Sequence, residues 1–250
     1  MKKISLFVIA SAISISTFAQ EAAKKEKVNT FEFHAKGLAN STWLFNNNIS
    51  NTGDSQDYDM GWGFNYGLGF TAYFGNVGFG IEGLMGNHKA AFTGKLETKV
   101  GGVVLNTTDY TSSINFSTIQ VPVMFKLKST GGAYLEVGAQ YNMISAADYK
   151  RTGNYMNADT AISASVTKNF ASSYFSGVLG FGAAIPFGDE SPMAILVGMR
   201  LQYSFTDLKG VDALGQDLSD SFIYNKYEAT SAASGGLTLG FVYKIGGKKK

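Results

Sequence analysis

The 250-residue chain has no cysteine, only two histidines and only three prolines. The absence of cysteine excludes disulfides, thiolate metal sites and thiol nucleophiles, and two histidines are too few for a three-histidine zinc site. Charged residues are also scarce, at 16%, whereas aromatic residues reach 14%, which is the opposite of a disordered composition. We therefore expect one folded domain that binds no metal or other cofactor.

The first residues have the pattern of an export signal. Lys2 and Lys3 form a basic start, the stretch from Ile4 to Ile15 is apolar, and small residues stand at Thr17 and Ala19. This predicts a signal peptide over residues 1–19; the alternative, an uncleaved anchor, requires about 20 apolar residues. Without Lys2 and Lys3 the chain has equal numbers of basic and acidic residues, so we expect no nucleic-acid partner.

No later segment has the 18 consecutive apolar residues typical of a transmembrane helix. Instead, every even position from Met60 to Phe74 is apolar, and the odd positions are mostly glycine, asparagine or threonine. These 15 residues exceed the usual soluble strand of about 5 to 6 and suit a tilted strand crossing a membrane, which needs about 9 to 11. The apolar face is expected to point to lipid, and the glycine-rich face to line a narrow barrel.

The same alternation recurs in seven other segments, which gives eight predicted strands. The seven segments are Phe31–Phe45, Val77–Met85, Ile119–Leu127, Leu135–Met143, Phe175–Ile185, Met193–Phe205 and Leu237–Ile245. Short links (75–76, 128–132 and 188–192) alternate with long polar ones (46–57, 93–113, 146–169 and 206–226). This alternation is typical of outer-membrane barrels, and an even strand number places both termini in the periplasm.

The predicted fold is therefore all-β: an eight-stranded, antiparallel, up-and-down transmembrane barrel over residues 31–245. A periplasmic tail over residues 20–30 precedes it, and a basic tail over residues 246–250 follows it. A secreted soluble barrel is the alternative, but its second face would carry many more charged residues.

A few charged residues fall on the face that is expected to line the barrel. An interior of eight strands is narrow enough for side chains to fill, so these residues are expected to pair in a buried polar network that plugs the lumen. They are Lys36, Glu82, Lys126, Glu136, Arg200 and Lys244.

Several short segments resemble a known family. Ile119–Lys126, Tyr134–Gly138 and Arg200–Ser204 are similar to the outer-membrane β-barrel domain of Bacteroidota, the PorT-like family, with Gln120 where that family often has an acid. The resemblance implies an eight-stranded outer-membrane barrel similar to the small OmpA and OmpX barrels, and fixes no role. The tripeptide Asp159–Ala161 also resembles a Bacteroidota O-glycosylation site.

No residue pattern points to catalysis. The sequence favours an outer-membrane protein with a structural or interaction role; a narrow porin and a lipid-modifying enzyme are the alternatives. The expected partners are outer-membrane lipid and lipopolysaccharide, the barrel-assembly machinery, and an unknown surface ligand or envelope protein. The acids of the last long connection lack the spacing of a calcium loop and are expected to be solvated: Asp207, Asp212, Asp217 and Asp220.

Overall fold

The computed structural model describes residues 29–155, 158–188 and 191–246, so the predicted signal peptide, most of the N-terminal tail and residues 247–250 lie outside the described residues. The elements in chain order are β1 (Asn29–Phe45), α2 (Asn47–Ser50), η1 (Gly53–Ser55), β2 (Asp57–Asp59), β3 (Gly61–Phe74), β4 (Val77–Val100), β5 (Val103–Lys128), β6 (Ala133–Tyr155), β7 (Ala158–Ser165), η2 (Thr167–Asn169), β8 (Ser173–Pro186), β9 (Met193–Ser204) and β10 (Ser231–Gly246).

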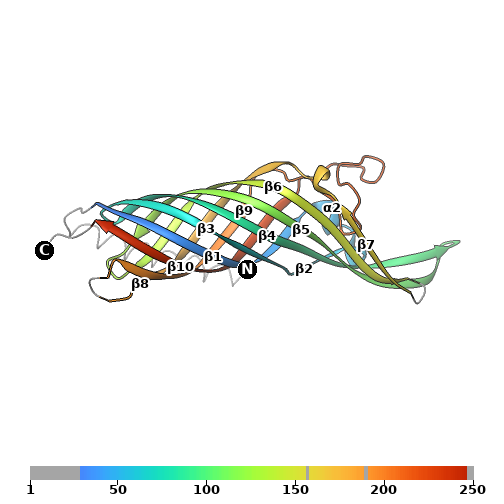
Figure 1. The fold of residues 1–250 in the computed structure, drawn as a ribbon. Helices are drawn as coiled ribbons and strands as arrows, with labels where there is room; N and C mark the ends of the chain where they lie inside the picture. Colours follow the sequence, from blue (N-terminus) through green and yellow to red (C-terminus); the bar gives the residue numbers. More distant parts are fainter. Residues whose placement is uncertain (1–28, 156–157, 189–190, 247–250) are drawn as a thin grey trace, which may run out of the picture.

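Most of these strands form one closed antiparallel ring (Figure 1). The order around the ring is β1, β3, β4, β5, β6, β8, β9 and β10, and β10 pairs again with β1. β2 and β7 lie outside the ring, paired with β4 and β6 respectively. The described residues thus contain ten strands, two more than the sequence predicts.

Alternating side chains divide the wall into an outer and an inner face. On β3, Trp62 and Leu68 are 63% and 70% exposed, whereas Asn65 and Thr71 are 0% and 1% exposed. Successive strand residues point to opposite faces, so the apolar half of the pattern lies outside and the small and polar half lies inside. This confirms the predicted orientation of the large apolar side chains. None of the described helices has the length and hydrophobicity needed to cross a membrane.

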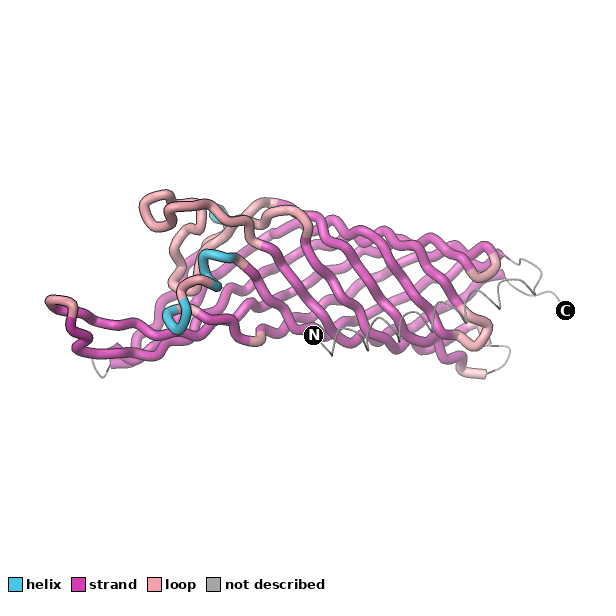
Figure 2. Tube along the Cα trace, turned by 180° about the vertical axis from the view of Figure 1, so that it is seen from behind, coloured by secondary structure: helices cyan, strands magenta, loops and turns pink. Residues whose placement is uncertain are grey.

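The two ends of the barrel differ (Figures 1 and 2). At one end, here called the turn end, short links join β3 to β4, β5 to β6, and β8 to β9. At the other, the loop end, β4 and β5 run for 24 and 26 residues to a tight turn at Gly101 and Gly102, both with positive φ. β6 likewise continues beyond the ring and pairs with β7.

The predicted loops at 93–113 and 146–169 are therefore wrong. Residues in both segments pair across hairpins, for example Leu96 with Thr108 and Arg151 with Ile162. Their threonine, valine and tyrosine residues favour extended backbone even where the alternation of polar and apolar residues is weak.

The remaining links at the loop end also have defined structure. Asn46 caps the N-terminus of α2, and its side-chain oxygen accepts a hydrogen bond from the Asn48 backbone N–H at 2.8 Å. The segment between β9 and β10, residues 205–230, contains no strand or helix; it folds across the loop end and is called the lid below.

Candidate functional site

Five of the six predicted interior charges meet inside the barrel. The Arg200 guanidinium on β9 lies between two carboxylates, 2.8 Å from Glu82 Oε2 and 2.5 Å from Glu136 Oε1. Lys36 Nζ lies 2.6 Å from Glu82 Oε1, and Lys126 Nζ lies 3.1 Å from Glu136 Oε2. All five residues are 4% exposed or less. They form what we call the charged cluster, in which three cations surround two carboxylates.

Glycines on neighbouring strands make room for the charged cluster. A Cβ at Gly180 would lie 2.5 Å from Glu136 Oε1, and a Cβ at Gly69 would lie 2.7 Å from Glu82 Cγ. Both distances are shorter than a normal carbon contact, so any larger residue at these positions would displace a carboxylate. This explains why the inner face is rich in glycine next to the charges.

Lys244, the sixth predicted residue, is not part of the charged cluster. It lines a hollow at the turn end together with Glu32 and Lys128, which form an ion pair with each other. Sequence reasoning missed this pair, and it also missed His34, whose Nε2 lies 3.1 Å from Glu82 Oε1. The available signal was the spacing of Glu32, His34 and Lys36 at every second position of one strand, which places all three on one face.

Uncharged polar side chains form the next layer towards the loop end. Asn142 Nδ2 donates to Ser176 Oγ at 2.5 Å, and Gln140 Nε2 donates to Asn142 Oδ1 at 2.5 Å and to Gln202 Oε1 at 3.2 Å. On the adjoining strands β4 and β5, Gln120 Nε2 lies 2.9 Å from His88 Nε2, and Gln120 is the register partner of Asn142. Both histidines are therefore held in the interior, where they contact polar side chains.

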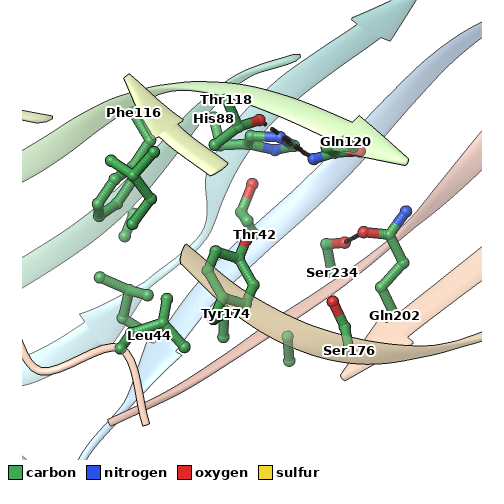
Figure 3. Close-up of a pocket in the computed structure, with 15 residues that line it drawn as sticks. Thr42, Leu44, His88, Phe116, Thr118, Gln120, Tyr174, Ser176, Gln202 and Ser234 are labelled. Atoms are coloured by element: carbon green, nitrogen blue, oxygen red, sulfur yellow. Dashed lines mark hydrogen bonds between the residues drawn. The ribbon is translucent and has the colours of Figure 1, made fainter. Parts of the chain in front are cut away.

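A small cavity of about 30 Å³ lies within this polar layer (Figure 3). Thr42, His88, Thr118, Gln120 and Ser234 line its polar side. Leu44, Phe116, Ile144 and Leu208 line the side towards the loop end.

The loop end of the interior is filled by an apolar cluster that we call the outer core. Phe116 packs edge-on against Phe170 with ring centroids 4.9 Å apart. The lid contributes four members that are 2% exposed or less: Leu208, Val211, Ala213 and Leu218. A smaller apolar cluster at the turn end contains Tyr134, Ala184 and Leu196. The polar layers thus lie between two apolar ones, and the lid is not the wholly exposed polar loop that the sequence suggested.

The aspartates of the lid are structural. Each accepts a hydrogen bond from the backbone N–H two residues further on, which fixes a tight turn; the pairs are Asp207 with Lys209, Asp212 with Leu214, Asp217 with Ser219, and Asp220 with Phe222. Asp212 is 0% exposed and also accepts from Gln56 at 3.0 Å and from Tyr224 at 2.6 Å. The prediction that this carboxylate is solvated is therefore wrong, because it connects the lid to the segment before β2.

Two lid tyrosines, Tyr224 and Tyr227, have a raised pKa, in each case because of burial and a hydrogen bond to an aspartate. Partial burial, together with the hydrogen bond to Asp207, raises the pKa of the Tyr227 hydroxyl to about 12. This phenol therefore stays protonated and donating at alkaline pH values at which a free tyrosine ionises. Within the described ranges, no three histidine, aspartate or glutamate side chains are grouped so that they could hold a metal ion.

Three solved outer-membrane proteins are similar to this chain at low sequence identity. Neisserial surface protein A matches with 10% identity over 85% of this chain and 97% of its own, at a TM-score of 0.36. OprG from Pseudomonas aeruginosa matches with 15% identity over 88% of this chain and 97% of its own, at 0.38, and Ail of Yersinia pestis with 10% identity over 88% and 100%, at 0.34. No curated protein matches the sequence.

A family model described as "Outer membrane protein beta-barrel domain" matches residues 18–210, which is well over half of the chain. The chain belongs to the outer membrane protein beta-barrel domain family.

Proposed function

We propose that the protein is an eight-stranded outer-membrane barrel with a closed lumen, whose role is structural or interactive. The eight strands of the ring would cross the membrane, and β2 and β7 would belong to the external end. The short links of the turn end support a periplasmic position for that end and for both termini, because outer-membrane barrels have short periplasmic turns and longer external loops. The segment Ile119–Lys126 supports a place in the PorT-like branch found in Bacteroidota.

The filled interior is the observation that carries this proposal. Arg200 and Glu82 are each 2% exposed at mid-barrel, and Leu208 and Leu218 are 2% and 1% exposed beneath the lid. A continuous aqueous path would expose charged side chains of the interior to water, and it would require the lid to leave the outer core. A porin with a permanently open lumen is therefore disfavoured.

The external end offers a surface for a partner. Among the described residues, β4 and β5 pair only with each other over Gly94–Val100 and Val103–Asp109, because the pairing of β5 with β6 begins at Tyr110. This two-stranded ribbon ends in apolar side chains, with Val100, Val103 and Leu105 62%, 63% and 64% exposed. Unpaired strand edges and exposed apolar groups outside the membrane favour binding of another molecule, such as a surface ligand or an envelope protein.

We further propose that the protein is not an enzyme and needs no cofactor. A general base must reach its substrate, but His34 and His88 are 5% and 7% exposed and are bonded within the lumen. Its membrane partners would be lipid and lipopolysaccharide around the wall, with the barrel-assembly machinery inserting the chain.

Planar-bilayer recording of the purified, folded protein tests the closed lumen, with an open porin in the same membranes as the positive control. The folded state is verified first by heat-modifiable gel mobility. We expect insertion without discrete conductance steps. Reproducible steps of uniform size from the folded protein would contradict a closed lumen and favour the narrow porin.

A further inference from the structure

Three residues that line the cavity in the uncharged layer carry buried polar atoms that lack a protein partner. Thr42 Oγ1, His88 Nδ1 and Gln120 Oε1 are buried and make no hydrogen bond to the described residues, and their side chains belong to residues that are 8%, 7% and 1% exposed. All three residues line the same cavity (Figure 3). Buried polar groups in folded proteins are almost always hydrogen-bonded to protein or to ordered water.

The hydrogen-bond chemistry of these atoms is mixed. The Gln120 amide nitrogen can only donate, so the contact at 2.9 Å makes His88 Nε2 the acceptor and leaves the ring proton on Nδ1. The lining residues therefore carry one free N–H donor at His88, one free carbonyl acceptor at Gln120, and a hydroxyl at Thr42 that can do either. A ligand that satisfies all three must both donate and accept.

The size of the cavity limits the ligand. One water molecule needs about 10 to 15 Å³ of such volume, so a cavity of about 30 Å³ has room for about two. A cation is disfavoured, because the adjacent charged cluster already has Lys36, Lys126 and Arg200 against only Glu82 and Glu136. Water is the small molecule that fits both the volume and the donor and acceptor pattern.

The same layer contains further unpartnered atoms next to the cavity. A Cβ at Gly63 would lie 2.8 Å from both Asn40 Oδ1 and His88 Nδ1, so these two atoms face one small space. Asn40 Oδ1 also lacks a protein partner. The group of unpartnered polar atoms therefore extends from His88 to Asn40 on β1, next to Gly63 on β3.

We propose that this cavity is a binding site for ordered water, which bridges Thr42 on β1, His88 on β4 and Gln120 on β5. The outer core covers the side towards the loop end, and the charged cluster lies on the side towards the turn end. The bound water is therefore enclosed, and it exchanges with bulk solvent only when the lid or the cluster opens.

Water relaxation dispersion on the folded protein in detergent micelles tests the proposal directly. We expect about two long-lived water molecules in the wild type, and fewer in Thr42→Val, which has the same shape without the hydroxyl. A wild-type protein without long-lived internal water would overturn the proposal, and this measurement does not depend on any variant folding.

The stability of Thr42→Val gives an independent test, because a hydrated cavity and a dry cavity predict opposite changes in the unfolding equilibrium constant. If water bridges the hydroxyl, the unfolding equilibrium constant rises about fivefold, the factor for one net hydrogen bond. If the cavity is dry, the substitution removes an unsatisfied buried hydroxyl and the constant falls, which would refute the proposal. Thr107→Val, on the exposed ribbon, is the matched control and should leave the constant unchanged.

A comparison of salts tests for a bound cation. A stability that is higher in sodium chloride than in choline chloride at equal ionic strength would indicate a cation in the cavity and would refute the proposal.

Discussion

The charge balance of the charged cluster predicts which of its members matters most for stability. Glu82 contacts Lys36, Lys126 and Arg200, at 2.6, 3.4 and 2.8 Å. Glu82→Gln leaves three cations around the single carboxylate of Glu136. Leaving a buried charge uncompensated costs about 3–5 kcal/mol, so we expect a loss of that size in the free energy of unfolding.

Arg200→Met should cost less, although Arg200 makes more hydrogen bonds with the cluster than either lysine does. The substitution keeps most of the volume and leaves two lysines facing two carboxylates, with Lys36 on Glu82 and Lys126 on Glu136. The loss then reduces to the charge-assisted hydrogen bonds of the guanidinium, about 1.5–3 kcal/mol.

Urea unfolding of the protein in lipid vesicles, followed by tryptophan fluorescence, measures both costs. The double variant should cost less than the sum of the two single variants, because Glu82 and Arg200 are direct partners. A cost for Arg200→Met equal to or greater than that of Glu82→Gln would refute the reasoning, because it would show that net charge does not decide the stability of the cluster.

Three further predictions concern other parts of the molecule. Because the chain has no cysteine, a single cysteine at Thr107 should react with a membrane-impermeant maleimide on intact cells, and one at Asn76 in the turn end should not; the reverse result would invert the proposed orientation. Gly180→Ala should destabilise the barrel by about 1–3 kcal/mol in urea titrations, whereas Gly177→Ala, with no atom within 4 Å of the added Cβ, should be near neutral; equal costs would exclude crowding of the charged cluster. Between about pH 10 and 12 the unfolded phenol of Tyr227 loses its proton before the folded one does, so the stability that this tyrosine contributes is fully present below about pH 10 and is lost progressively as the pH rises to about 12. Tyr227→Phe should flatten this part of the pH profile of lid proteolysis, and an unchanged profile would contradict the assignment.

The sequence was sufficient to predict which face of the wall is apolar, but not the height of a residue along the barrel. Period-two alternation predicts which side of a strand Lys244 and Lys36 occupy, and it places both inside. Their distance from Glu82 depends on strand register and tilt, which local pattern does not contain. Lys244 therefore lies at the turn end, while Lys36 lies beside Glu82.

The lid shows a second limit of local pattern. Leu208, Val211 and Leu218 are separated by aspartates and glycines, a composition typical of exposed turns. Their burial depends on contacts with Phe116 and Tyr149 from distant strands, which only the closed ring brings together. The aspartates were recognised as loop residues, but their role in fixing turns requires the backbone geometry.

The seam between β1 and β10 has a consequence for biogenesis. It joins Thr30 to Gly246 and Phe45 to Ser231, so the two ends of the chain must meet before the cylinder exists. Pairing residues that lie so far apart in the sequence closes a very long loop, which costs conformational entropy and is slow. The nascent polypeptide therefore has to be kept from aggregating until its last strand has been made, and a truncation that removes β10 leaves β1 with an open hydrogen-bonding edge in the membrane.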